Sequence, residues 1–319
     1  MKLEDQLRRV LRARHYSVRT EEAYVGWYRK YVRFHGLRHP AEMGGEEVAA
    51  FLTHLAVNRR VMASTQNQAL NALVFLYREV LKQPFEDVDV KRAKQSKRLP
   101  TVLSVEEVGK LLGVMQGEEG LMARLLYGCG LRVMECMRLR VKDLDLSGGK
   151  LEVRGGKGDK DRVLTLPKSV RAGLEGQLQR CRAIYEKDRK TGVAGVYVPG
   201  AFEVKQAKAG ESWPWFWVFP SDKVSEDPRI SGLRRRHHAH ESRVGRALAA
   251  AVRLTGLEKR VTAHTLRHSF ATHLVLRGVD VRSVQELMGH ADLRTTMVYV
   301  QLARAMRGEI GSPLDDLMG

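Results

Sequence analysis

The sequence predicts a mainly helical protein with a small antiparallel β-sheet, divided into two domains. Apolar residues recur at helical spacing through residues 1–81 and again through most of residues 102–319. A polar stretch with a proline near each end separates these regions and shows neither helical nor strand periodicity. The clearest strand pattern is a pair of short apolar runs around a glycine-rich turn in the second region. A chain of 319 residues is long enough for two domains that each bury a core.

The first domain, residues 1–90, is expected to be a bundle of about four helices. Its apolar stripes begin near Leu3, Tyr24, Val48 and Leu70. Residues 91–101 are expected to form a linker, because the surrounding segment KQPFEDVDVKRAKQSKRLP has no regular period. The basic run KRAKQSKR within it can follow a phosphate backbone.

The second domain, residues 102–319, opens with a capping box at Ser104–Glu107 that begins a helix. The runs LEVRGG and RVLTLP flank KGDKD and predict a β-hairpin. A tryptophan-rich strand is expected near residues 213–220, and helices are expected over most of the remainder. The second domain is therefore predicted to be mostly helical with a small sheet.

The charge of the chain favours a polyanionic partner. Fifty-five Lys and Arg against 37 Asp and Glu give a net charge of +18, and nucleic acid is the commonest polyanion in a cytoplasm, although a basic surface facing only solvent is the simpler alternative. No apolar run reaches the length of a membrane span, and the N-terminus lacks the features of a signal peptide. We therefore expect a cytoplasmic protein without membrane association, whose Cys129, Cys136 and Cys181 are buried thiols.

The segment HTLRHSFATH, residues 264–273, poses a choice between a metal and a phosphate ligand. His264 and His268 have the spacing of the zinc motif HExxH, but Thr265 stands where that motif has its glutamate. Arg267 lies between them and repels a divalent cation, whereas its planar guanidinium can hold two phosphate oxygens. We expect no metal here and assign phosphate binding to His264 and Arg267, leaving His268 and His273 to the helix surface or core.

Three further stretches place chemically active residues at special positions. Arg132 follows the Gly-x-Gly turn of GCGLRVMEC at the start of a helix, and Lys157 lies at the tip of the predicted hairpin. His290 directly follows Gly289, the expected left-handed C-cap of a helix, and Tyr299 comes nine residues later on the next helix. Each position alone has an ordinary structural explanation.

Together and in this order these motifs resemble the tyrosine recombinases over essentially the whole chain, because the N-terminal helices and the basic linker also match that family. The resemblance implies a catalytic set of Arg132, Lys157, His264, Arg267, His290 and Tyr299, with no metal or other cofactor. It further implies that Glu135, where the family often has an acid, orients Arg132.

The same resemblance implies a role for each group in phosphodiester cleavage. Arg132 and Arg267 would clamp the nonbridging oxygens and stabilise the pentacoordinate transition state. Tyr299 would attack the phosphorus and form a 3′-phosphotyrosine, with His264 and the arginines helping it to lose its proton. Lys157 would protonate the leaving 5′ oxygen as general acid, and the remaining histidine of the set would donate a hydrogen bond to the phosphate.

An insertion over about residues 190–242, a segment that a minimal recombinase lacks, indicates one branch of this family. It contains WPWFWVFPSDKVSEDPR and LRRRHHAHES, and with GSPLD near the C-terminus it resembles the integron integrases. That resemblance implies a folded single-stranded site with flipped-out bases, in addition to duplex sites, and a homotetramer on DNA. Trp213, Trp215, Trp217 and Phe219 alternate on the expected strand and offer faces for base stacking. The DNA contacts expected from matching positions are Trp215, Pro228, Arg235, Arg236, His237 and His238.

Other functions stay open at this point. A duplex-specific recombinase of the phage-integrase or chromosome-resolving type is the nearest alternative, with the insertion serving another purpose. A DNA-binding regulator without catalysis is disfavoured by the presence of all six active-site residues, and a metal-dependent nuclease is weaker still.

Overall fold

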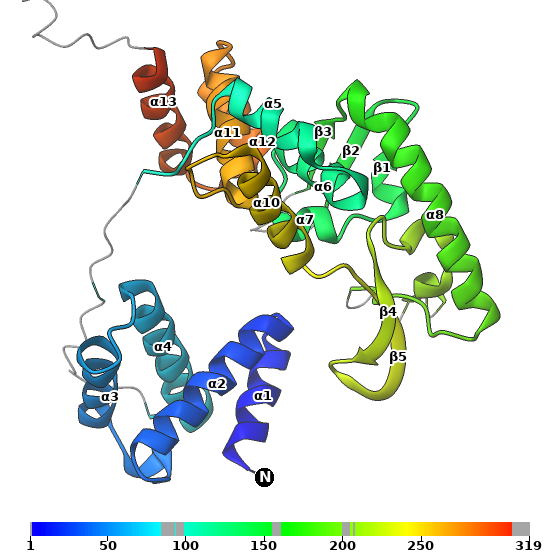
Figure 1. The fold of residues 1–319 in the computed structure, drawn as a ribbon. Coiled ribbons are helices and arrows are strands. Elements are labelled where there is room, and N and C mark those ends of the chain that lie inside the picture. Colours follow the sequence, from blue (N-terminus) through cyan, green and yellow to red (C-terminus); the bar gives the residue numbers. More distant parts are fainter. Residues whose placement is uncertain are drawn as a thin grey trace, which may run out of the picture. The chain divides into compact units, whose positions relative to one another are not determined.

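The computed structural model (Figure 1) describes residues 2–83, 93, 99–154, 161–199, 205–206 and 208–307. The chain divides into two compact units, Met1–Arg98 and Leu99–Gly319. Helices make up most of both units, and the named strands form one three-stranded and one two-stranded antiparallel sheet. The predicted fold class is confirmed. Over the described ranges, no helix combines the length and the hydropathy that crossing a membrane requires.

The first unit packs the apolar stripes of its helices into one core. In chain order the elements are α1 (Leu3–Ala13), α2 (Val18–Phe34), a 3₁₀ turn (Pro40–Glu42), α3 (Gly45–Val57), α4 (Ala63–Phe75) and a π-helical turn (Leu76–Leu81). All four predicted stripes contribute to this core. Its buried polar groups have partners: the Tyr31 and Tyr77 hydroxyls lie 2.9 Å apart, and the Glu21 carboxylate receives hydrogen bonds from Arg8 and Arg12.

The second unit begins with helices, continues through the small sheet and ends with helices. Its first half contains α5 (Val105–Val114), α6 (Gly117–Gly128), α7 (Val133–Met137), β1 (Leu144–Asp145), β2 (Lys150–Val153), β3 (Arg162–Thr165) and α8 (Arg171–Lys190). Its second half contains β4 (Pro220–Asp227), β5 (Ile230–His238), α10 (Ser242–Thr255), α11 (Ala263–Leu276), α12 (Val281–Met288) and α13 (Leu293–Arg307).

Two local predictions in this unit agree with the structure. Ser104 and Glu107 form the capping box of α5, with the Ser104 amide 2.7 Å from Glu107 Oε2 and the Glu107 amide 3.2 Å from Ser104 Oγ. β2 and β3 pair antiparallel, with Leu151 opposite Leu164 and Val153 opposite Arg162, as the hairpin prediction requires. The tip of this hairpin, which contains Lys157, lies outside the described residues.

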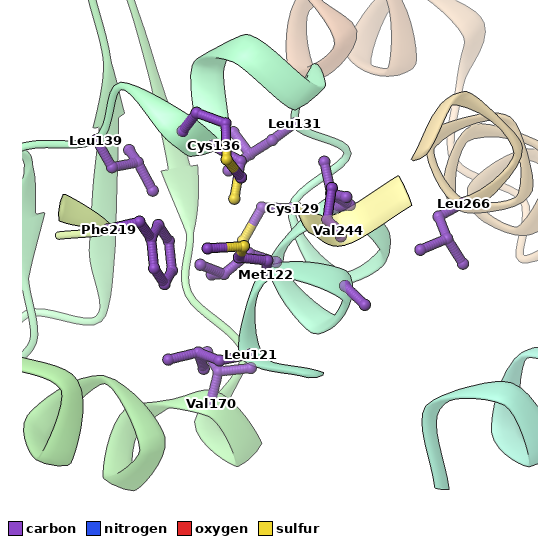
Figure 2. Packing of buried hydrophobic residues seen from close by; sticks show 14 of the residues in the cluster. Leu121, Met122, Cys129, Leu131, Cys136, Leu139, Val170, Phe219, Val244 and Leu266 are labelled. Carbon is purple, nitrogen blue, oxygen red and sulfur yellow. The ribbon is translucent and has the colours of Figure 1, made fainter. Parts of the chain in front are cut away.

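The core of the second unit forms around α6. This helix is apolar on several sides, and its Leu121 and Met122 pack with Phe219, Val244 and other buried side chains from distant segments (Figure 2). The sulfur atoms of two cysteines lie among these apolar groups, and all three cysteines of the chain are free and buried, as predicted. Burial raises the pKa of the Cys129 thiol to about 12, so this thiol stays protonated at neutral pH.

The insertion contributes the β4–β5 hairpin (Figure 1), whose register runs from Pro220 opposite His238 to Asp227 opposite Ile230 with two irregularities. The prediction of a tryptophan-rich strand over residues 213–220 is wrong. Trp213–Trp215 form a 3₁₀ turn, because Pro214 has no N–H to donate to a strand and fits the first turn of a helix.

The aromatic residues after this turn do not alternate on one strand face. Phe216, Trp217 and Phe219 are all buried, and Trp213 stacks on Phe216 with an interplanar angle of 21°. Residues 216–219 therefore form part of the core, and of the aromatics expected on one strand face only Trp213 and Trp215 escape full burial.

Candidate active site

The structure brings together every predicted catalytic residue that it describes. α11, α12 and α13 pack against one another (Figure 1), and the start of α7 approaches them. α11 supplies His264 and Arg267, the connection after α12 supplies His290, α13 supplies Tyr299, and the residue preceding α7 is Arg132.

Arg132 is held at the N-terminus of α7 by a tight turn. Gly130 has φ +60°, and a Cβ atom there would lie 2.4 Å from the Phe270 ring, so glycine is required on both conformational and steric grounds. The Arg132 guanidinium donates to Glu135 Oε1 at 2.7 Å and to the carbonyl of Gly289 at 2.9 Å. These bonds hold the positive charge of Arg132 beside the C-terminal end of α12.

Arg267 is almost fully buried, with 3% of its surface exposed. Its guanidinium donates to the backbone carbonyls of Gly130 and Met288, and its Nη1 lies 3.8 Å from the Glu135 carboxylate. Burial, followed by the charge of Arg132, lowers the pKa of Arg267 to about 10. Arg267 therefore stays cationic at neutral pH, and the site contains two fixed positive charges.

Glu135 lies between these cations and a third arginine that the sequence analysis did not identify. Arg162, the first residue of β3, donates to both carboxylate oxygens of Glu135, at 2.6 and 3.1 Å, and to the carbonyl of Leu287 at 2.9 Å. It thus connects the β2–β3 hairpin to the end of α12. Glu135 orients Arg132 as predicted, and it also pairs with Arg162.

Tyr299 is 3% exposed and lies on the face of α13 that packs against α11. Its hydroxyl is 3.0 Å from Nδ1 of His268. Burial raises the pKa of Tyr299, while the charges of Arg267 and Arg132 oppose that rise. The phenol is therefore neutral at neutral pH in this structure. His268, which the sequence analysis left to the helix surface or core, is half-buried, and its ring contacts the predicted nucleophile.

His290 lies beside the same phenol. Gly289 before it has φ +59° and ends α12 as the predicted left-handed C-cap. The rings of His290 and Tyr299 are stacked at 21° with centroids 6.0 Å apart, and His290 Nδ1 is 3.0 Å from Oγ1 of the buried Thr296. Burial, followed by the charges of Arg267 and Arg132, lowers the pKa of His290 to about 4. The imidazole is therefore neutral at pH 7.

The two remaining histidines of α11 have different environments. His264 lies on the first turn, exposed at the surface, with its ring centroid 6.2 Å from that of His268. Loss of solvation and the charges of Arg267 and Arg132 lower its pKa. His273 is buried, and its ring nitrogens lie 2.9 Å from the Tyr127 hydroxyl and from the Leu103 carbonyl. Of the two positions that the sequence analysis left open for His273, helix surface or core, the structure shows the core.

No cluster of three or more His, Cys, Asp or Glu side chains suited to a metal occurs within the described part of the chain. The groups that converge here are three arginine cations with the Glu135 carboxylate between them, neutral imidazoles and one phenol. Such a set can bind an anionic phosphate and hold it beside a hydroxyl.

Two of the expected DNA contacts in the insertion, Arg235 and Arg236, are buried and paired inside the domain. Arg236 is 7% exposed, and its guanidinium donates to Asp188 at 2.8 Å and to the carbonyls of Ser221 and Asp222. Arg235 is 6% exposed and donates to the carbonyl of Val196 at 3.2 Å. In this structure the charge of Arg236 pairs with Asp188 and that of Arg235 with Asp227, whose Oδ2 is 3.5 Å away. A phosphate contact by these arginines stays a prediction.

The other expected contacts lie at several points of the insertion. Pro228 is exposed at the turn between β4 and β5. Trp215 is half-buried, with Lys142 Nζ 3.1 Å from its ring centroid. His238 packs edge-on against Trp217 at 5.4 Å, and the buried Nε2 of His237 has no hydrogen-bond partner within the described ranges.

Comparison with known proteins identifies the family. Residues 101–306 match the model of the phage integrase family, and residues 3–87 match the N-terminal SAM-like domain of phage integrases. The chain belongs to the phage integrase family, the tyrosine recombinases. As a member of this family it is an enzyme that cleaves and rejoins DNA strands in site-specific recombination.

Relatives and solved structures agree with this identification. Proteins named integrase/recombinase from Escherichia coli and Pseudomonas aeruginosa are each 50% identical over 318 residues, 99% of this chain and 94% of the relative. The tyrosine recombinase XerA of Thermococcus kodakarensis is 32% identical over 298 residues, 90% of this chain and 86% of the relative.

The fold is shared with recombinases whose structures contain DNA. The XerH site-specific recombinase in a post-cleavage complex with palindromic difH substrate has a TM-score of 0.62 at 21% identity, with 96% of this chain and 83% of that chain covered. The Tn1549 transposon integrase in complex with transposon right end DNA has a TM-score of 0.60 at 15% identity, with 98% and 100% covered.

Proposed function

We propose that Tyr299 is the nucleophile of this recombinase and that the enzyme inserts and excises integron gene cassettes by recognising folded single-stranded sites. The observation that carries the catalytic assignment is the position of the Tyr299 hydroxyl, 3.0 Å from His268 and within the influence of the positive charges of Arg267 and Arg132. The remaining members of the proposed catalytic set are Lys157, His264 and His290.

The two arginines are suited to binding the scissile phosphate. Each has part of its guanidinium fixed by backbone carbonyls, which sets its direction before the substrate arrives. Donors that are already oriented stabilise the charge of a pentacoordinate phosphorus without reorganisation in the transition state. His290 adds a donor in the tautomer whose Nδ1 accepts a hydrogen bond from the Thr296 hydroxyl, because the ring proton is then on Nε2.

The proposed reaction exchanges one phosphoester for another. The Tyr299 oxygen forms a bond to phosphorus, the bond from phosphorus to the 5′ oxygen breaks, and Lys157 supplies a proton to that oxygen. The product is a 3′-phosphotyrosine and a free 5′-hydroxyl. Attack by the 5′-hydroxyl of another strand reverses these steps and joins the DNA without a further energy source.

The proposal of a folded substrate rests on the insertion. The β4–β5 hairpin presents Pro228 on an exposed turn. Trp215 is half-buried with Lys142 Nζ over its ring, and we propose that an unpaired base stacks on this side chain in place of the lysine. His237 adds a ring nitrogen that has no partner within the described part of the domain. We further propose that four protomers assemble on two sites in the cytoplasm.

The test compares two forms of one cassette site. Labelled folded strands and duplexes are incubated with the protein, and covalent complexes are counted after denaturation. Preferential cleavage of the folded strand supports the proposal, and equal or greater cleavage of duplex contradicts it. Because one stacked base is worth about 1–3 kcal/mol, Trp215→Ala should weaken hairpin binding by roughly 5-fold to 150-fold.

The matched control for that substitution is Trp213→Ala. Trp213 lies in the same 3₁₀ turn but stacks on Phe216 inside the domain. A hairpin without protruding bases should bind poorly to the unsubstituted protein and be insensitive to Trp215→Ala. Equal losses from both tryptophan variants on both hairpins would assign these side chains to folding.

A duplex-specific recombinase is the second candidate, and one observation favours it. The burial of Trp217, Phe219, Arg235 and Arg236 removes much of the surface that the sequence offered for flipped bases. On this alternative the insertion stabilises the domain, and the same comparison of folded and duplex sites decides between the two substrates.

A further inference from the structure

The contact between His268 and Tyr299 links α11 to α13 at the tyrosine hydroxyl, the proposed nucleophile. His268 lies one turn after His264 on α11, and its Nδ1 is 3.0 Å from the Tyr299 hydroxyl on α13. Among the described residues, His268 provides the one side-chain hydrogen bond found for this hydroxyl. The distance is that of a direct hydrogen bond, and the phenol, 3% exposed, has little contact with water that could take its proton.

The groups that surround the His268 ring favour its neutral form. They are His264 and Arg267 on α11, Tyr299 on α13 and His290 before α13. Burial, followed by His264 and Arg267, lowers the pKa of His268 to about 4. A neutral imidazole with its proton on Nε2 leaves Nδ1 free to accept a hydrogen bond from the phenol.

Resting on the proposed role of Tyr299 as nucleophile, we propose that His268 is the general base that accepts the Tyr299 proton. As the tyrosine oxygen bonds to phosphorus, the O–H bond breaks and its proton passes to Nδ1. The phosphorus–O5′ bond breaks in the same displacement, and the 5′ oxygen takes a proton from the acid. In the joining step His268 returns its proton to the tyrosine oxygen, and the site regains its initial state.

Bound DNA supplies the condition that makes this transfer favourable. In the free protein, the charge of Arg267 opposes formation of an imidazolium. A phosphodiester held by Arg132 and Arg267 brings a negative charge that offsets those cations and raises the proton affinity of His268. The nucleophile is therefore activated when a phosphate occupies the site, and the free enzyme keeps a neutral phenol.

His264 is less suited to this task, although it belongs to the proposed catalytic set. It lies exposed on the first turn of α11, and its ring centroid is 6.2 Å from that of His268. His268, in contrast, has ring contacts with both His264 and Tyr299, at centroid distances of 6.2 and 5.7 Å. We therefore propose phosphate binding for His264 and proton acceptance for His268, two roles that the sequence analysis gave to His264 alone.

The experiment measures single-turnover formation of the covalent complex on a nicked substrate that traps it. His268→Asn keeps a hydrogen-bonding oxygen near the position of Nδ1 but cannot take a proton. General base catalysis contributes about 10²-fold to 10⁴-fold, so this variant should be slower by that factor with little change in DNA affinity. His273→Asn, a buried histidine of the same helix without contact to Tyr299, is the control and should retain the rate.

A more acidic nucleophile separates proton transfer from positioning. With 3,5-difluorotyrosine at position 299, the phenol ionises more readily and depends less on a base. The ratio of the rate with histidine at position 268 to the rate of His268→Asn should therefore shrink by roughly 10-fold or more. A His268→Asn rate equal to that of the unsubstituted protein, or a ratio unchanged by fluorination, overturns the proposal. If the unsubstituted protein forms no covalent complex through Tyr299, the proposed function itself fails. Melting temperatures show whether both histidine variants are folded.

Discussion

The carboxylate of Glu135 is the point where removal of one charge should disturb the active site most. It receives hydrogen bonds from the guanidinium groups of Arg132 and Arg162 at 2.7 and 2.6 Å and from the Arg132 amide at 2.8 Å. Glu135→Gln preserves the volume but removes the negative charge. The cations of Arg132, Arg162 and Arg267 would then face one another without compensation.

The expected loss of stability follows from burial. Side-chain exposure is 11% for Glu135 and 10% for Arg162, so this is a largely buried pair, whereas Arg132 is exposed to 25%. Removing one partner of a buried pair costs about 3–5 kcal/mol. Glutamine keeps one acceptor oxygen, so we take the lower end, about 3 kcal/mol. At about 2–4 °C per kcal/mol for a domain of this size, the melting temperature should fall by roughly 6–12 °C.

The pH dependence of this loss provides a second check. Burial acts to raise the pKa of Glu135, but the bonds and charges of Arg162 and Arg132 outweigh it and hold that pKa below its usual value. A carboxyl with a lower pKa in the folded state stabilises the protein fully above the unfolded value of about 4.3. That contribution disappears as pH falls through the folded pKa. The difference between the parent and Glu135→Gln should therefore be constant from pH 7 to about 5 and shrink below about 4.

Chemical denaturation of both proteins at several pH values measures this difference. The control is Glu119→Gln, which also loses a carboxylate 2.7 Å from an arginine, Arg243, but at a site where 30% of the glutamate side chain is exposed. A pair of this kind contributes at most about 1 kcal/mol. Equal losses from the two glutamine variants, or a Glu135→Gln difference that persists undiminished at pH 3, would refute the reasoning.

Three further outcomes are expected. Tyr299→Phe should abolish covalent DNA attachment with little change in affinity, and attachment through another tyrosine would contradict the assignment. Lys157→Ala should cleave normal DNA slowly but recover on a substrate with sulfur at the 5′ bridging position, whose leaving group needs no proton; without recovery, Lys157 binds phosphate instead. Arg236→Ala leaves the buried Asp188 unpaired and should cost about 3–5 kcal/mol of unfolding free energy, whereas reduced DNA affinity at an unchanged melting temperature would show a direct DNA contact.

The sequence alone was enough to identify the family and to predict the catalytic set. The motifs GLR, HTLRH and MGH, followed by a tyrosine at a fixed spacing, are local patterns, and local patterns can be read without tertiary contacts. The helical class followed from apolar periodicity, and the capping box of α5 and the C-cap at Gly289 followed from short-range backbone chemistry. Each of these features depends on residues within one or two helical turns of each other.

Only the tertiary structure revealed the contacts of His268 and Arg162 in the site. His268 contacts a tyrosine 31 residues away on another helix, and Arg162 pairs with a carboxylate 27 residues away. In the sequence, each of them is one polar residue among many in a strongly basic chain. Their partners are set by the packing of α11 against α13 and of β3 against α12, which no short-range pattern encodes.

The insertion shows the same division between local and long-range information. The sequence identified its aromatic and basic content, but exposure decides whether such residues bind DNA or support the fold. Asp188 on α8 lies 48 residues before Arg236 and neutralises it, and the core around α6 buries Phe219. Charge and hydropathy state what a side chain can do, whereas burial depends on which distant segments cover it, and those contacts form only when the chain folds.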